Sequence, residues 1–354
     1  MTPNYQLPSS EFWGSRNVLV TGHTGFKGWW ITHLLTALGA NVSGVSLDSE
    51  PTSVRPSNDL SSRLRQEEFF NISDLHKFQN FIRLVKPDTI IHLAAHAIVQ
   101  TGYFQPYDTF RDNFLGTLNL LEILRLEKLV ENPLILISTT DKVYKESAVK
   151  IPHRESNELW GSDPYSASKV SVELLAETYR CNFVELSELF IARAGNVLGG
   201  GDRGESRLVP YLINQVKSKS PVELRMPSAI RPWQHVLDVT SAYLYILETG
   251  DQLPSRTYNV APKNPENLTV QELSSLFLEK FQSSSEILTG GKIFGNETHE
   301  LNISSQAFEE DSGFINKLNV KEAIQLTEEW ESSVQIGKSA SEITIKQILD
   351  YLNA

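Results

Sequence analysis

The sequence is poor in cysteine, in long apolar runs and in positive charge, and each shortage narrows the class of protein. Its 354 residues include one cysteine, Cys181, so an internal disulfide is excluded and a reducing compartment is favoured. No apolar run approaches the ~18 residues of a membrane span, and the N-terminal residues lack the pattern of a signal peptide. The net charge of -11, from 32 basic and 43 acidic residues, disfavours nucleic acid and anionic membranes as partners. We therefore expect a cytoplasmic protein that binds neither nucleic acid nor membrane.

The composition is that of a globular protein, with 40% hydrophobic and 21% charged residues. Short apolar runs alternate with segments of helical periodicity. The expected strands are residues 17–21, 41–47, 88–97, 133–139 and 188–198, and the expected helices are 26–39, 110–130 and about 166–181. This alternation predicts an α/β fold with a Rossmann-type doubly wound parallel sheet. We assign to it residues 1–195, with a return segment near 235–262. Residues 196–354 are expected to form mainly a smaller C-terminal substrate-binding lobe, with loop at 281–296.

A glycine-rich loop, TGHTGFKG at residues 21–28, joins the first expected strand to the first expected helix. The spacing of Gly22, Gly25 and Gly28 lets the chain turn tightly and approach a diphosphate, which the N-terminus of the helix faces with N–H groups. Asp48 ends the next strand, where a carboxylate accepts hydrogen bonds from a ribose and repels a 2′-phosphate. The simpler alternatives are that residues 21–28 form a plain strand–helix turn and that Asp48 is an ordinary loop aspartate. In this context the motif predicts NAD as the cofactor.

A second motif, DPYSASK at residues 163–169, places Tyr165 and Lys169 four residues apart at a helix start. Side chains at that spacing lie on the same helix face. An ammonium beside a phenol lowers the phenol's pKa, so we expect Tyr165 to serve as a base near neutral pH. The pair alone recurs by chance in many chains, but here it follows a dinucleotide-binding pattern.

Taken together, the motifs resemble the extended short-chain dehydrogenase/reductase family, and within it the CDP-glucose 4,6-dehydratases. The stretches that carry the resemblance span roughly residues 12–260 and are FWGSRNVLVTGHTGFKGWW, HLAAHAIV, DNFLGTLNLLE, STTDKVY, DPYSASK, RAGNVLGGGD, RLVP and IRPWQHVLD. The resemblance implies an NAD-dependent lyase that oxidises C4 of a nucleotide-linked glucose, eliminates water across C5 and C6, and returns the hydride to C6. It also implies a homodimer and a role in deoxysugar biosynthesis for surface polysaccharide such as the O-antigen of lipopolysaccharide.

The resemblance further implies catalytic roles at the end of the strand 133–139. Thr140 would hydrogen-bond the C4 oxygen, Asp141 would protonate the leaving C6 hydroxyl, and Lys142 would remove the C5 proton. Those roles require a raised pKa for Asp141 and a lowered pKa for Lys142. A surface ion pair between the two side chains is the alternative.

Binding residues follow from the same resemblance. For the cofactor they are Gly22, Thr24, Gly25, Phe26, Gly28, Asp48, Asn71, Ile72, Leu93, Ala94, Ala95, Tyr165 and Lys169, and for the substrate they are Asn196, Arg207, Arg225 and Arg231. Arg231 would clamp a diphosphate through its forked guanidinium. Surface ion pairs remain an alternative for Arg207 and Arg225.

Two positions, 71 and 203, depart from the pattern of the family. Asn71 stands where relatives have an aspartate that contacts adenine, and an asparagine can also accept a hydrogen bond from the adenine amine. Arg203 stands where relatives tend to have tryptophan, and the nucleotide base of the substrate is not readable from the pocket residues. His92 and His96 are expected on a strand and at its end, and we expect no metal site.

Other functions stay open at this point. The chain could be another nucleotide-sugar enzyme, such as a GDP-mannose 4,6-dehydratase or a UDP-sugar 4-epimerase, although an epimerase does not need the pair Asp141 and Lys142. A dinucleotide-sensing regulator is disfavoured, because such proteins typically lose the tyrosine or the lysine that this chain retains at Tyr165 and Lys169.

Overall fold

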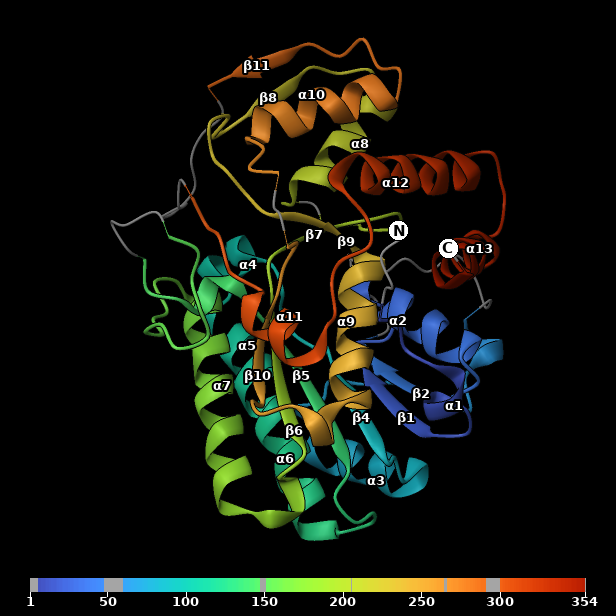
Figure 1. Ribbon diagram of the computed structural model, residues 1–354, viewed down its shortest axis with the longest axis vertical. Coiled ribbons are helices and arrows are strands. Elements are labelled where there is room, and N and C mark those ends of the chain that lie inside the picture. The colour runs from blue at the N-terminus through green and yellow to red at the C-terminus, as the bar shows by residue number, and fades with distance from the viewer. Residues whose placement is uncertain are drawn as a thin grey trace.

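The structure is a computed structural model that describes residues 6–47, 60–146, 151–204, 206–263, 266–290 and 300–353. Its centre is a parallel sheet of seven strands in the order β10-β6-β5-β4-β1-β2-β3 (Figure 1). In that order the strands are Thr257–Val260, Leu189–Ala194, Leu134–Thr140, Thr89–His92, Asn17–Thr21, Asn41–Ser46 and Gln66–Phe69. The chain winds outward from β1 in both directions, which is the doubly wound arrangement predicted from the sequence. That prediction of the fold class is confirmed.

The register of the strands decides what lies at the carboxyl edge of the sheet. Thr21 at the end of β1 is level with His92 at the end of β4, and His92 is level with Ile137 in β5. Residues 138–140 of β5 therefore extend beyond β4, still paired with β6 as far as Ala194. Ligands of doubly wound sheets bind outside the carboxyl ends of the strands. The overhang of β5 thus carries its last side chains into that region.

Helices cover both faces of the sheet, because each sheet face is apolar and must be buried. One face packs against α2 and α9, and α13 packs on α2, in an apolar cluster that includes Trp29, Trp30 and Tyr243. The other face packs against α3, α6 and α7 in a cluster that includes Phe78 and Leu120. These helices are α2 (Phe26–Ala37), α3 (Leu75–Val85), α6 (Gly116–Glu127), α7 (Pro164–Asn182), α9 (Val236–Glu248) and α13 (Ala340–Asn353).

Shorter helices complete this part of the chain. They are α1 (Ser10–Trp13), α4 (Val99–Phe104), α5 (Pro106–Phe110) and α11 (Gln306–Ser312). A turn of π-helix over Arg111–Leu115 joins α5 to α6. α4 and α5 both pack against α7, so the segment that follows β4 reaches the start of that helix.

A second group of elements stands beyond the carboxyl edge of the sheet, at the top of Figure 1. It contains two small parallel sheets, β7 with β9 and β8 with β11, and three helices around a separate apolar cluster that includes Leu212, Phe277 and Ile324. The strands are β7 (Asn196–Leu198), β8 (Val222–Leu224), β9 (Trp233–His235) and β11 (Ile287–Thr289). The helices are α8 (Leu208–Ser218), α10 (Val270–Lys280) and α12 (Val320–Gln335).

Several sequence-based boundaries need correction. The single strand expected over 188–198 is wrong, because the chain leaves the sheet at Gly195 and continues as β7 beside β9. The strand expected over 88–97 ends at His92, and the expected loop 281–296 contains β11, with 291–296 outside the described residues. β3 was not predicted, since QEEF is a partly exposed edge strand without an apolar run.

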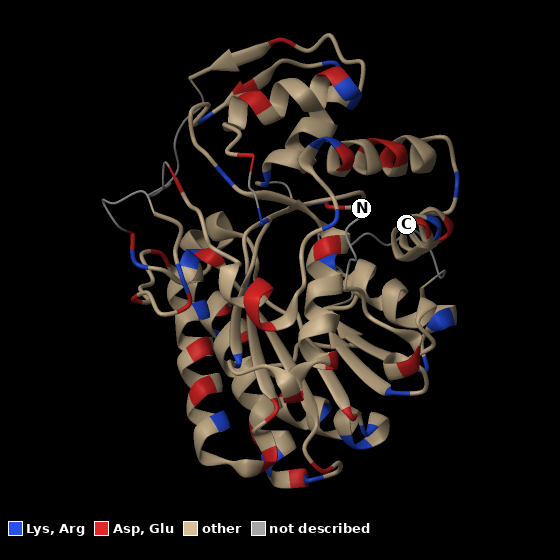
Figure 2. Cartoon of the chain, viewed as in Figure 1, with Lys and Arg blue, Asp and Glu red and all other residues tan. Residues whose placement is uncertain are grey.

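Charge is spread over the outer helices (Figure 2). α7 carries both acidic and basic residues, and acidic residues also occur on α10, α11 and α12. Among the helices that the structure describes, none has both the length and the apolar character that a membrane crossing requires.

Candidate functional site

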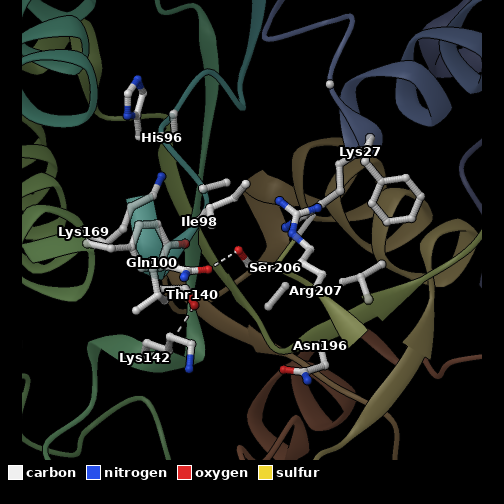
Figure 3. A pocket seen from close by; sticks show the side chains of 18 of the residues that line it. Lys27, His96, Ile98, Gln100, Thr140, Lys142, Lys169, Asn196, Ser206 and Arg207 are labelled. Carbon is white, nitrogen blue, oxygen red and sulfur yellow. Dashed lines mark hydrogen bonds between the residues drawn. The ribbon is translucent and has the colours of Figure 1, made fainter. Parts of the chain in front are cut away.

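A cavity of about 780 Å³ opens at the carboxyl edge of the sheet, between the sheet and the second group of elements. The glycine loop, the ends of β4 and β5 and the start of α7 line one side of it. Residues of the segments 206–211 and 223–233 line the other side, and Ser206 donates a hydrogen bond to Gln100 of α4. Figure 3 shows these side chains converging from both sides.

The glycine loop is shaped for close approach of a ligand backbone. Gly22 has φ +73°, and a Cβ there would lie 2.8 Å from the backbone nitrogen of Ala94. A Cβ on Gly28 would lie 1.9 Å from the carbonyl oxygen of Gly22, so only glycine lets α2 start against the loop. Gly25 is the N-cap of α2 and has no side chain to cap the first N–H groups. The loop therefore offers the N–H groups and the space that a diphosphate needs.

Other features of the loop fit a dinucleotide as well. Thr24 donates its N–H to Ser46 Oγ at 3.1 Å, which ties the loop to the end of β2. Its own Oγ1 is buried at the cavity and has no hydrogen-bond partner among the described residues. Phe26 follows at the first position of α2 and is buried. An unsatisfied buried hydroxyl in a polar cradle is what a bound phosphate or ribose would satisfy.

The remaining expected cofactor residues lie along the same cavity. Leu93, Ala94 and Ala95 follow β4, and Ile72 follows β3. Asn71 also lines the cavity, where its Oδ1 accepts from Ser73 N at 2.9 Å and its Nδ2 donates to Asp112 at 2.8 Å. Asp48 lies outside the described residues.

The overhang of β5 brings three of the expected catalytic residues together. Thr140 ends the strand and accepts a hydrogen bond from Lys142 N at 3.3 Å, which starts a 3₁₀ turn over Asp141–Val143. Thr140 Oγ1 donates to Asp141 Oδ1 at 3.0 Å. Behind them, Thr139 donates to Glu173, which pairs with Arg193 of β6 at 2.5 Å. This buried pair fixes the end of the strand from which the site projects.

Asp141 is held in a setting that favours its neutral form. The residue is 2% exposed, and its Oδ2 has no hydrogen-bond partner in the described part of the chain. Burial raises the pKa of Asp141, and Lys142, Thr140, Arg231 and Lys27 offset this only in part. The structure gives no ion pair between Asp141 and Lys142 within the described residues, and Lys142 is half-buried at the cavity. The arrangement is therefore not the surface ion pair considered as an alternative.

The Tyr165–Lys169 pair is positioned by the start of α7. Asp163 is the N-cap, accepting from Ser166 N at 3.0 Å, and Pro164 occupies the first helical position. This is a strong helix start, because proline there sacrifices no hydrogen bond. Tyr165 and Lys169 are both buried and both line the cavity. Tyr165 is hydrogen-bonded to the side chain of Thr140, so α7 and β5 meet at one point of the site.

The protonation of this pair corrects the sequence-based expectation. Burial raises the pKa of Tyr165, and the hydrogen bond with Thr140 opposes it. Lys169 donates to the backbone oxygen of Ser138 at 3.1 Å. Burial and then the charge of Lys27 lower the pKa of Lys169 to about 7. The prediction that Lys169 lowers the pKa of Tyr165 is wrong for this structure, because the desolvation of a buried phenol dominates.

The four expected substrate residues all line the cavity, and they follow the last residue of β6 in the chain. Asn196 begins β7, and Arg231 precedes β9, donating to the backbone oxygen of Ile230 at 2.8 Å. Arg207 is the N-cap of α8 and pairs with Asp202 at 2.9 Å, whereas Arg225 follows β8 and is exposed. Three guanidinium groups thus face one cavity from three separate segments.

Residues outside the predicted set also shape the site. Lys27, at the start of α2, is half-buried and lines the cavity, and its signal in the sequence was a lysine inside the glycine motif. Arg203, singled out from the sequence, does not line the cavity but pairs with Glu331 of α12 at 2.7 Å. His92 is buried, and burial followed by the charge of Lys169 lowers its pKa to about 3. His96 pairs with Asp112 at 2.9 Å.

No cluster of side chains suited to holding a metal ion occurs within the described ranges. The donors that face the cavity are N–H groups, hydroxyls, ammonium and guanidinium groups, which suit an anionic organic ligand such as a dinucleotide. The chemistry of the site and the geometry of the glycine loop both fit NAD.

Comparison with known proteins agrees with this geometry. Residues 18–261 match the NAD dependent epimerase/dehydratase family. The chain is 32% identical to the CDP-glucose 4,6-dehydratase of Salmonella typhimurium over 97% of this chain and 98% of that protein. It is 26% identical to the probable dTDP-glucose 4,6-dehydratase of Sinorhizobium fredii over 88% of this chain and 92% of that protein. The resemblance expected from the sequence is thereby confirmed.

Solved structures show the same fold. The UDP-glucose 4-epimerase of Thermotoga maritima superposes with a TM-score of 0.78 at 23% identity, over 90% of this chain and 99% of that chain. The dTDP-glucose 4,6-dehydratase of Bacillus anthracis, in complex with NAD, superposes with a TM-score of 0.76 at 19% identity, over 91% of this chain and 98% of that chain. The protein described here therefore belongs to the NAD dependent epimerase/dehydratase family, and NAD is its cofactor.

Proposed function

We propose that the protein is a lyase that converts CDP-glucose to CDP-4-keto-6-deoxyglucose. The observation that carries the proposal is the buried Asp141, which has one carboxylate oxygen without a hydrogen-bond partner among the described residues and lies next to Lys142 at the cavity that also holds Tyr165. An epimerase of this fold needs the tyrosine and lysine of α7 but has no use for a second acid and base. The 32% identity to the Salmonella CDP-glucose 4,6-dehydratase supports the choice of nucleotide.

The side chains divide the chemistry as follows. Tyr165 would take the proton of the C4 hydroxyl as a phenolate, and the positive charge of oxidised NAD, when bound, would oppose the burial that raises its pKa. Thr140 hydrogen-bonds the C4 oxygen as it becomes a carbonyl. When bound, NAD supplies hydride-acceptor and hydride-donor chemistry. Lys142 then takes the proton from C5, which the C4 carbonyl makes acidic, and Asp141 gives its proton to the C6 hydroxyl, which leaves as water. Asp141 suits the acid role because its burial raises its pKa.

Binding is divided between the two sides of the cavity. We assign the cofactor to Gly22, Thr24, Gly25, Phe26, Gly28, Asn71, Ile72, Leu93, Ala94 and Ala95, with Asp48 as the expected ribose ligand. We assign the nucleotide sugar to Asn196, Arg207, Arg225 and Arg231, since all four line the cavity and stand in or next to β7, α8, β8 and β9. On this basis residues 1–195, with a return segment near 235–262, bind NAD, and residues 196–354 mainly bind the sugar nucleotide. α11 and α13 are exceptions, because α11 packs against β10 and α13 packs against α2.

We further propose a cytoplasmic homodimer whose product enters deoxysugar synthesis for surface polysaccharide. Large apolar side chains are exposed on the surface formed by α4, α5 and α7. Phe104 is 68% exposed, Tyr107 is 78% exposed and Leu174 is 60% exposed. Exposed apolar groups of this size, gathered on packed helices, are typical of an interface between subunits.

The test is to incubate the purified protein separately with CDP-glucose, dTDP-glucose, UDP-glucose and GDP-mannose and to follow each sugar by NMR. We expect a 4-keto-6-deoxy sugar from CDP-glucose alone. The same product from another nucleotide sugar alone would overturn the choice of substrate. Inversion at C4 without loss of water would overturn the dehydratase mechanism and identify an epimerase.

A further inference from the structure

Lys27 is a half-buried cation whose side-chain hydrogen bonds within the described residues go to neutral hydroxyls. It lies in the first turn of α2, directly after the glycine loop, and its side chain reaches the end of β5 and the middle of α9. Its ammonium donates to Ser138 Oγ at 3.4 Å and to Tyr243 Oη at 3.2 Å, which are neutral hydroxyls. Those hydroxyls are hydrogen-bonded to each other at 2.9 Å.

The charges near Lys27 leave its own charge uncompensated. Asp141 attracts the ammonium without forming an ion pair with it in the described part of the chain. Burial and then the charge of Arg207 lower the pKa of Lys27 to about 8, against this attraction. A buried ammonium with only neutral hydrogen-bond partners is unfavourable unless a ligand supplies the counter-charge.

Arg207 brings a second positive charge to the same place from the opposite side of the cavity. It stands at the N-terminus of α8, where its pairing with Asp202 orients the guanidinium. Figure 3 shows the nitrogen-bearing ends of Lys27 and Arg207 turned toward each other inside the cavity. Two like charges held close repel each other, and an anion between them removes the repulsion.

We propose that Lys27 and Arg207 together bind a diphosphate group, with Lys27 contributing from the cofactor side of the cavity and Arg207 from the substrate side. Diphosphate chemistry fits because a phosphate chain offers several acceptor oxygens to a lysine point charge and to a forked guanidinium at once. The proposal rests on the proposed function in one respect, that the cavity takes a nucleotide sugar. Both that substrate and NAD contain a diphosphate, and we expect the substrate to be the ligand of Lys27, because Arg207 approaches from the substrate side.

The experiment compares the holoenzyme with its Lys27→Met variant, in which the side chain keeps its length and loses its charge. Calorimetry measures the affinity for CDP, UDP, GDP, dTDP and CMP, and protein fluorescence measures the affinity for NAD in the same preparations. We expect the variant to bind the preferred nucleoside diphosphate roughly tenfold or more weakly, the usual effect of losing a charged hydrogen bond. The difference in affinity between CDP and CMP should become smaller in the variant, and the affinity for NAD should not change.

Two further variants make the result specific. Lys280→Met changes an exposed lysine of α10 in the same way and should leave every affinity unchanged. Arg207→Met combined with Lys27→Met should weaken binding by less than the product of the two single effects if both side chains hold one diphosphate. Lys27 is half-buried and has no ion pair among the described residues, so removing its charge should not lower the melting temperature, and a loss of affinity would not reflect unfolding.

The outcomes distinguish the inference about Lys27 from the proposal that CDP-glucose is the substrate. Weakened binding of UDP, GDP or dTDP instead of CDP would keep the role of Lys27 and overturn only the choice of CDP-glucose. Weakened binding of NAD alone would keep the diphosphate ligand and assign it to the cofactor. Unchanged affinity for NAD and for every nucleoside diphosphate would overturn the inference.

Discussion

Replacing Asp141 by asparagine should abolish turnover while making the protein more stable at alkaline pH. The substitution keeps the shape of the side chain and the acceptor for Thr140 Oγ1, and it removes the proton that the leaving hydroxyl needs. Loss of a general acid typically lowers kcat by about 10²–10⁴-fold, or roughly 3–5 kcal/mol of transition-state stabilisation. We expect a loss of this size, with NAD still bound.

The gain in stability follows from the environment of the carboxylate. Burial raises the pKa of Asp141 in the folded protein, so its contribution to stability is present below the unfolded pKa of about 4 and is lost as pH rises through the folded pKa. Asparagine cannot ionise, so the variant does not lose stability in this way as pH rises. A buried carboxylate oxygen without a partner costs about 1–3 kcal/mol, and the nearby charges of Lys142, Arg231 and Lys27 reduce the figure.

The assay is thermal unfolding of both proteins across a pH series, together with turnover of CDP-glucose. The unfolding entropy is roughly 2.1 cal/mol/K per residue. For 354 residues, a shift of one degree in melting temperature therefore corresponds to a change of about 0.7 kcal/mol in the free energy of unfolding. The variant should therefore melt about 1–4 °C higher than the wild type at about pH 8, and the difference should vanish towards about pH 4. Asp251→Asn, at an exposed aspartate, serves as the control with no expected change.

Two results would refute this reasoning. Turnover within about threefold of the wild type would show that Asp141 is not the acid. A variant that is less stable at every pH would show that the carboxylate is ionised and paired in the folded protein, against its raised pKa.

Three further predictions concern the cofactor loop, the base and the pH dependence of folding. Gly28→Ala should abolish NAD binding, measured by fluorescence titration, because the new methyl group would lie 1.9 Å from the Gly22 oxygen; undiminished binding would contradict the assigned role of the loop. Lys142→Met should keep NAD binding and lose both product formation and exchange of the C5 proton with deuterated solvent, measured by NMR, and unchanged turnover would exclude Lys142 as the base. Burial raises the pKa of Asp238 from 3.8 to about 7, so wild-type stability should fall between about pH 4 and pH 7, by at most about 4 kcal/mol. Asp238→Asn should flatten that decline in thermal unfolding, and parallel pH curves for the two proteins would contradict it.

The sequence alone predicts the parts of the site that local rules control. Gly22, Gly25 and Gly28 indicate a diphosphate loop because glycine spacing, a preceding strand and a following helix are all local features. Asp163 and Pro164 mark the start of α7, and that start puts Tyr165 and Lys169 on one face. These elements lie where the sequence patterns place them.

The edges of the sheet are less predictable. β3 is a polar edge strand, and its pairing with β2 gives it a structure that its own residues do not indicate. The run 188–198 is uniformly strand-like, yet it divides at Gly195 because the two halves find partners in different sheets. A strand's partner is chosen by the whole fold, since its backbone hydrogen bonds go to another segment.

The sequence by itself determined the fold class, the cofactor loop and the residue types at the end of β5 and the start of α7. Only the tertiary structure decided their protonation: burial raises the pKa of Asp141 and Tyr165 and lowers that of Lys169. It also decided that Lys27 faces Arg207 across the cavity, although 180 positions separate them (207 minus 27). The physical reason is that spacing along a chain sets local geometry, whereas desolvation and charge proximity depend on segments that only folding brings together.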